Sequence, residues 1–143
     1  MIYVIGSLRN PRVPQIANTL REHKFDVFDE WYAAGEKADD AWRAYEKAKG
    51  NALPTALKGY AAQHVFLLDK FHLDRCSAVV LLTPAGKSGH VELGWALGRG
   101  KKGYILLDSD PDRYDVMYGF ADGVFFHLTQ LIDELSKIRR GEK

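Results

Sequence analysis

The amino-acid sequence predicts a single-domain α/β fold in which one parallel sheet is covered by helices. Five short apolar segments have the length and composition of buried strands; they are 2–5, 25–28, 78–83, 104–107 and 124–126. Segments of helical length separate most of them, and this alternation is typical of a parallel sheet covered on both faces. A length of 143 residues suits one domain over 1–143.

The helices are predicted from their end signals and from apolar residues at helical spacing. A first helix is expected to start at Pro14, because proline favours the first turn. Further helices are expected over 38–49, closed by Gly50, and over 54–75 and 128–140. The segment 54–75 carries a stripe of apolar residues that we expect to face the core.

The composition excludes several classes of protein. Apolar residues make up 46% and charged residues 27%, which is ordinary for a soluble globular protein. A net charge of +1 gives no reason to expect a nucleic-acid polymer or a membrane as partner. The single Cys76 excludes an internal disulfide and suits a reducing compartment. These observations predict a cytoplasmic protein.

The most informative segment is 88–101, which follows the predicted strand 78–83. A helix is expected to begin after Gly89, which places Glu92 in its first turn, above the end of a strand. Ligands bind at this edge in open α/β sheets. The positive end of the helix is expected to keep the carboxylate ionised, as a nucleophile requires. The alternative is that Glu92 only stabilises the helix. Trp95 is expected to pack this helix on the sheet.

Parallel sheets of this kind commonly have the flavodoxin-like strand order 2-1-3-4-5, with the ligand between strands 1 and 3. The first strand is followed by Gly6, Ser7 and Arg9. Glycine lets a backbone approach a ligand, the serine hydroxyl can donate, and arginine can hold an anion with two hydrogen bonds. An ordinary turn with a solvated Arg9 is the alternative.

A second carboxylate, Asp69, lies at the edge of the apolar stripe of segment 54–75, beside Leu68. A charge on a core-facing stripe favours a position facing a ligand site, although periodicity does not exclude the exposed face. Two carboxylates facing a sugar are the minimal equipment for retaining glycosyl transfer.

These segments together resemble the nucleoside 2-deoxyribosyltransferase superfamily, including its branch of 2'-deoxynucleoside 5'-monophosphate N-hydrolases. The resemblance runs from Ile2 to about Leu135. The loop leading into Glu92-Leu93-Gly94-Trp95-Ala96 is similar to the nucleophile motif of that family. Asp69, shortly before strand 78–83, is similar to its second motif, and Tyr3 to Arg9 resembles the start of the N-hydrolases.

The resemblance implies cleavage of the N-glycosidic bond of a 2'-deoxynucleoside or its 5'-monophosphate. Glu92 would attack the sugar, Asp69 would handle protons or orient the substrate, and Tyr3 would lie near the sugar. The implied substrate-binding residues are Gly6, Ser7, Arg9, Ser88 and Gly89, although the spacing of Ser88 from Glu92 differs from that of the family. Neither an organic cofactor nor a metal is implied, since carboxylates suffice for this chemistry.

One departure bears on the acceptor of the sugar. Transferases of this family bring an asparagine from a neighbouring subunit into the site, but the similar stretch 119–123 offers Asp122 and Gly123 instead. This favours transfer to water, with a base-exchanging transferase as the alternative. A non-catalytic nucleotide-binding module is the alternative from another class. The family also implies a homodimer or a larger homo-oligomer.

Other patterns in the sequence are weaker. His90 and Glu92 have the spacing of zinc deaminases, which need two further cysteines that a chain with one Cys lacks. His64 and His72 are expected to be packing or surface residues. Aromatic residues around Trp31 and Trp42 either stack on the base or fill a satellite core.

Overall fold

The computed structural model describes residues 1–141 and contains a five-stranded, all-parallel sheet of order β2-β1-β3-β4-β5. The strands are β1 (Ile2–Ile5), β2 (Val27–Phe28), β3 (Ala78–Leu82), β4 (Lys102–Leu106) and β5 (Gly123–Phe125). In the register, Ile2 is opposite Val27 on one side and Ala78 on the other. The predicted α/β class and strand order are confirmed, while strand ends differ from the expected ones by up to two residues.

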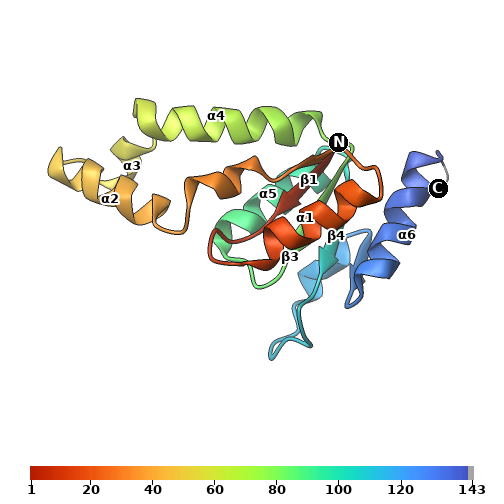
Figure 1. The fold of residues 1–143 in the computed structure, drawn as a ribbon. Helices are drawn as coiled ribbons and strands as arrows, with labels where there is room; N and C mark the ends of the chain where they lie inside the picture. Colours follow the sequence, from red (N-terminus) through yellow and green to blue (C-terminus); the bar gives the residue numbers. More distant parts are fainter. Residues whose placement is uncertain (142–143) are drawn as a thin grey trace.

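Alternate side chains of each strand face opposite sides of the sheet. Ile2 and Val4 belong to the core under α1 (Arg12–Glu22) and α6 (Leu128–Arg139). Tyr3 and Ile5 belong to the opposite core, which is covered by α5 (Lys87–Gly98) and the end of α4 (Tyr60–Arg75) (Figure 1). The sheet therefore presents Tyr3 to the two helices that carry the predicted carboxylates.

The expected start of the first helix at Pro14 is wrong by two residues. The helix begins at Arg12, whose backbone N–H donates to the Asn10 side chain at 3.0 Å. Pro14 then lies in the first turn, where its missing N–H breaks no helical hydrogen bond. The helix α2 (Ala38–Ala48) ends close to Gly50, which has a positive φ of 79°.

The single long helix expected over 54–75 is also wrong. The segment forms α3 (Leu53–Ala56) and α4, with Gly59 as the extended residue that precedes α4. A Cβ at Gly59 would lie 3.3 Å from the Ala56 carbonyl oxygen, which is tighter than ordinary contact. The chain turns at this glycine because no side chain obstructs the approach.

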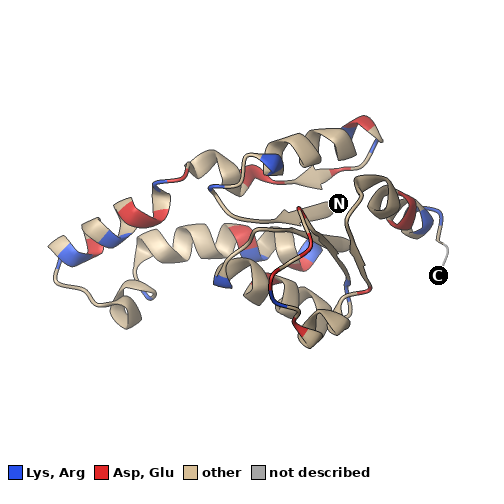
Figure 2. Ribbon diagram, turned by 90° about the horizontal axis from the view of Figure 1, so that it is seen from below, with Lys and Arg blue, Asp and Glu red and all other residues tan. Residues whose placement is uncertain are grey.

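The apolar stripe of this segment does not face the core, contrary to expectation. Of the residues of α4, only Leu73 is buried. The large apolar side chains that remain 49–57% exposed are Leu57, Val65, Phe66, Leu67, Leu68 and Phe71. The helices α2 and α3 and the start of α4 project beyond the sheet (Figure 1), and the first half of α4 contains no Lys, Arg, Asp or Glu (Figure 2). No helix within residues 1–141 combines the length and apolarity needed to cross a membrane.

Two short 3-10 helices complete the fold, η1 (Glu30–Ala34) and η2 (Val116–Phe120). Trp31 of η1 donates its indole N–H to the Val4 carbonyl at 2.8 Å and packs against both cores. Of the two possibilities that the sequence left open for Trp31, the structure favours packing, since this ring is fixed to β1.

Candidate active site

A hydrogen bond between Tyr3 and Glu92 lies at the centre of the candidate site. The Tyr3 hydroxyl donates to Glu92 Oε2 at 2.8 Å, which joins β1 to α5 across 89 residues of sequence. Tyr3 is fully buried, whereas Glu92 is half-buried. The hydrogen bond fixes one carboxylate oxygen of Glu92 and thereby orients the Glu92 side chain.

The helix that carries Glu92 begins earlier than expected. It starts at Lys87, with Gly86 as the preceding cap residue, so Glu92 lies in the second turn instead of the first. Gly89 is inside this helix and buried, and a Cβ there would lie 3.0 Å from Leu81 Cδ1 and 3.1 Å from Ile5 Cγ2. This glycine permits close packing of α5 on β1 and β3, which is why it does not mark a loop.

The expectation that the helix end keeps Glu92 ionised is wrong as well. Burial raises the pKa of Glu92 to about 7, the hydrogen bond from Tyr3 opposes this rise, and the charge of Asp69 adds to it. The pKa of Tyr3 is also raised, first by burial and then by the charges of Glu92 and Asp69. Tyr3 therefore remains a donor, and both protonation states of Glu92 are populated near neutral pH.

Asp69 of α4 is half-buried, and its charge acts on both Glu92 and Tyr3. Burial raises the pKa of Asp69, and the nearby His72 lowers it. The His72 ring stacks on Phe28 with centroids 4.0 Å apart, in the packing role expected from the sequence. Three predicted residues from β1, α4 and α5 are thus brought together on one face of the sheet.

A separate cavity of about 180 Å³ lies at the ends of β1 and β3, as predicted for ligand binding in this strand order. Its lining residues are Ser7, Arg9, Asn10, Pro84, Ala85 and Gly86. Gly86 precedes α5, and Asn10 lies just before α1. Helix N-termini present unpaired N–H groups and a positive potential, which favour an anion.

The predicted binding residues are not all found in this cavity. The Ser7 Oγ accepts a hydrogen bond from the Arg9 backbone N–H at 3.1 Å, which leaves its own O–H able to donate. The Arg9 side chain is 69% exposed and lies 3.7 Å from an Asp40 oxygen. Ser88 is exposed on the first turn of α5 and does not line the cavity. A Cβ at Gly6 would lie 2.9 Å from Val13 Cγ2, so the lack of a side chain at this glycine allows α1 to pack close to it.

Four cavity residues were not predicted as binding residues from the sequence: Asn10, Pro84, Ala85 and Gly86. Asn10 is only 4% exposed, and its side-chain Nδ2 has no hydrogen-bond partner within residues 1–141. Its Oδ1 accepts from Arg12 at the helix start. The signal for Asn10 is its place directly before Pro11 at the start of a helix, where asparagine side chains commonly bond to the backbone.

Asp122 lies in the stretch 119–123, which is similar to the region that supplies the asparagine in the transferases. In this chain two neighbouring residues hold its side chain. Its carboxylate accepts from the Gly103 backbone N–H at 2.8 Å and lies 3.6 Å from the Lys102 ammonium.

In the described residues, no three His, Cys, Asp or Glu side chains are grouped so that they could hold a metal ion.

Comparisons with known proteins support the fold. The chain is similar to the solved structure of the CMP N-glycosidase BcmB from Clostridium botulinum, with a TM-score of 0.56 and 14% sequence identity. The similarity covers 95% of this chain and 99% of that chain. No protein-family model and no curated protein sequence matches the chain. At this level of identity, the similarity shows a common fold over almost the whole of both chains.

Replacing Glu92 with Gln is expected to stabilise the folded chain at pH 8 but much less at pH 5. The pKa of Glu92 is about 7 in the folded chain, above the ordinary glutamate value of 4.5. The folded state therefore binds the proton more tightly, and this contribution to stability is lost as the pH rises through 7. This rise in the pKa of Glu92 corresponds to a stabilisation of no more than about 3–4 kcal/mol by Glu92→Gln at pH 8.

The free energy of urea unfolding at both pH values measures this effect. Glu134→Gln on α6 is the control, because it removes a more exposed carboxylate that is paired with Lys137. Equal effects of Glu92→Gln at pH 5 and pH 8 would contradict the assigned burial of Glu92.

Proposed function

We propose that this chain is an N-glycosidase that cleaves the N-glycosidic bond of a 2'-deoxynucleoside or its 5'-monophosphate through a covalent glycosyl-Glu92 intermediate. The observation that carries this proposal is the grouping of Glu92 and Asp69 around the buried Tyr3 hydroxyl. Two carboxyl groups and one fixed donor supply a nucleophile, a proton carrier and an orienting hydrogen bond.

In the first step, ionised Glu92 attacks C1' with Oε1 while the C1'–N bond breaks and its electron pair leaves with the base. Asp69 supplies the proton that neutralises the departing base, a role that suits a carboxyl whose pKa is raised by burial. In the second step, Asp69 takes a proton from water, the water oxygen bonds to C1', and the C1'–Oε1 bond breaks. Glu92 is released as the carboxylate.

Tyr3 serves both steps through its hydrogen bond to Glu92 Oε2. It holds the carboxylate in one orientation, so that the other oxygen can face the sugar. The same bond lowers the pKa of Glu92 against the effect of burial, which increases the ionised fraction near neutral pH. The hydroxyl can also stabilise the carboxylate that reforms when the ester is hydrolysed.

The cavity at the ends of β1 and β3 supports a 5'-monophosphate as the preferred form of substrate. It combines Ser7, Arg9 and Asn10 with two helix N-termini. Gly86 precedes Glu92 by six residues, roughly 9 Å along α5, a spacing that suits a sugar phosphate. The similar protein BcmB is itself described as acting on CMP. Gly6, Ser88 and Gly89 do not line this cavity, and their proposed contacts with the substrate would lie outside it.

Water is the favoured acceptor in this proposal. The stretch 119–123 has no asparagine to hold an acceptor base, and the Asp122 carboxylate is bonded to Gly103. A base-exchanging transferase is the second candidate, and it would require a partner subunit to supply the missing contact. The presence of Glu92 and Asp69 together argues against a binding module without catalysis. We also propose a cytoplasmic location, with no nucleic-acid polymer or membrane as partner.

Incubation with nucleosides and nucleoside 5'-monophosphates, in the ribose and 2'-deoxyribose forms, tests the function at pH 8. Chromatography is expected to detect free base and deoxyribose 5-phosphate, with no labelled nucleotide formed from added labelled base. Glu92→Gln should reduce the rate by several orders of magnitude, because the amide cannot act as nucleophile. Base release at an unchanged rate in this variant would contradict the role of Glu92, and labelled nucleotide would favour the transferase.

Arg9→Ala tests the proposed phosphate contact. Loss of one charge-assisted hydrogen bond should weaken monophosphate binding by ~1.5–3 kcal/mol, measured as the change in KM, and should scarcely affect the nucleoside. Asp40→Asn is the matched variant, since it removes the Arg9 ion pair and leaves the guanidinium in place. Equal losses for nucleoside and monophosphate in Arg9→Ala would mean that Arg9 has a structural role.

We further propose that the chain forms a homodimer or larger homo-oligomer through the exposed apolar side chains of α4. Its large apolar side chains, among them Phe66 and Leu67, are about half exposed on a helix whose first half contains no Lys, Arg, Asp or Glu (Figure 2). On α5, Val91 and Trp95 are also exposed, by 71% and 42%. Apolar patches of this extent on soluble proteins commonly mark interaction sites.

Sedimentation is expected to give a species of at least twice 16.1 kDa for the natural chain. The double variant Phe66→Glu/Leu67→Glu should sediment as a monomer, because a second copy could bury these charges only at high free-energy cost. Val116→Glu is the control, at an apolar residue that is 82% exposed on η2. A monomer produced by the control alone would place the interface elsewhere.

A further inference from the structure

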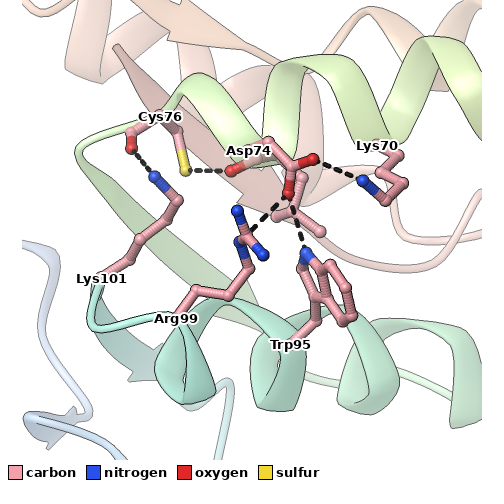
Figure 3. A network of polar contacts seen from close by, with 7 residues as sticks. Lys70, Asp74, Cys76, Trp95, Arg99 and Lys101 are labelled. Atoms are coloured by element: carbon pink, nitrogen blue, oxygen red, sulfur yellow. Dashed lines mark hydrogen bonds and ion pairs between the residues drawn. The ribbon is translucent and has the colours of Figure 1, made fainter.

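One carboxylate, Asp74 near the end of α4, connects this helix to α5 (Figure 3). It accepts the Trp95 indole N–H at 2.9 Å and lies 3.5 Å from Arg99 Nε, and both residues belong to α5 or its cap. On its own helix it accepts from Lys70 at 2.6 Å. The Lys70 ammonium and the Arg99 guanidinium lie over the Trp95 ring, 5.3 and 5.2 Å from its centroid.

This arrangement corrects the expectation that Trp95 packs α5 on the sheet. The Trp95 side chain is 42% exposed, and its indole N–H is used toward α4. The Trp95 ring thus contacts side chains of both α4 and α5. A second link lies just beyond α4, where the Lys101 ammonium donates to the Cys76 carbonyl at 2.7 Å (Figure 3).

The helix α4 has little apolar packing to hold it against the rest of the fold. Of its 16 residues only Leu73 is buried, and His72 stacks on Phe28. By comparison, α1 buries four apolar residues with 11 residues of length. Because α4 has so little apolar packing, the contacts of Asp74 with Trp95 and Arg99 contribute strongly to the separation of α4 from α5, together with the hydrogen bond from Lys101 to Cys76.

Both catalytic carboxyl groups lie close to this connection. Asp69 precedes Asp74 by five residues, about 7.5 Å along the helix, and Glu92 precedes Trp95 by three residues, about 4.5 Å. A helix is stiff over such lengths, so a displacement of α4 at Asp74 moves Asp69 relative to Glu92.

We propose that Asp74 is a positioning residue, which fixes the distance between Asp69 and Glu92 by binding Trp95 and Arg99 of α5. This inference rests on the function proposed above, in which the two carboxyl groups act as a pair. Displacements of about 1 Å at reacting groups can change rates by orders of magnitude.

The electrostatics of the site make this spacing measurable. The groups that act on Glu92 are Tyr3 from β1 and Asp69 from α4, and the charge of Asp69 raises the pKa of Glu92. Since the interaction weakens with distance, separation of α4 from α5 should lower that pKa. Asp74 itself stays ionised, because hydrogen bonds from Lys70 and Trp95 lower its pKa.

The experiment compares Trp95→Phe and Asp74→Ala with the natural chain. Trp95→Phe removes the indole N–H and keeps an aromatic ring beneath Lys70 and Arg99, whereas Asp74→Ala removes all three contacts. Titration of the Glu92 side-chain carboxyl carbon by NMR reports its pKa without any substrate. The pH dependence of kcat/KM for base release reports the same group during turnover.

We expect the pKa of Glu92 to fall by about one unit in Asp74→Ala and by less in Trp95→Phe, with kcat reduced about tenfold in Asp74→Ala. Glu134→Gln on α6, which breaks an ion pair away from these helices, should change neither quantity. A residue that only stabilised the fold would lower the amount of active protein and leave the pKa of Glu92 unchanged.

A pKa of Glu92 that equals the natural value in Trp95→Phe and Asp74→Ala overturns the proposal. If Asp74→Ala fails to fold, Trp95→Phe alone decides the outcome. If the natural chain releases no base from any nucleotide, the proposed function fails, yet the NMR titration still shows whether Asp74 sets the spacing of the pair.

Discussion

The burial of a carboxyl group against the Tyr3 hydroxyl is the constraint on which the candidate site depends. Tyr3 is fully enclosed on β1, so its O–H needs a partner, and Glu92 of α5 supplies one. Close packing of α5 on the strands at Gly89 brings Glu92 within reach. The same burial raises the pKa of Glu92 toward neutrality, so one arrangement sets geometry and protonation together.

The sheet could be predicted because its strands are short, apolar and separated by helices, and this pattern is local in the sequence. Errors arose where a glycine or proline has a meaning that depends on tertiary contacts. Gly59 turns the chain between two helices, whereas Gly89 lies inside a helix and permits packing. Residue type alone does not distinguish these two uses of glycine. Pro14 is tolerated anywhere in the first turn, so it marks a helix start only to within a few residues.

The chemistry-bearing residues could be named from the sequence, but their environment could not. The sequence pattern favours Glu92 and Asp69, the family resemblance implies Tyr3, and the fold places all three within electrostatic range of one another. The pKa of Glu92 depends on desolvation by elements distant in sequence, which no local pattern contains. Asp74 was missed for the same reason, since Trp95 lies 21 residues away and its use toward α4 is evident only after folding.

The helix α4 carries both Asp69 and several exposed apolar side chains. If a second copy of the chain packs against these apolar side chains, α4 belongs both to the interface between the copies and to the reaction centre. Conditions that dissociate the copies, such as high dilution or mild detergent, would then expose these side chains of α4 to water. The separation of Asp69 and Glu92 would change as a result. Specific activity would depend on protein concentration, even though every atom proposed to take part in the chemistry belongs to a single chain.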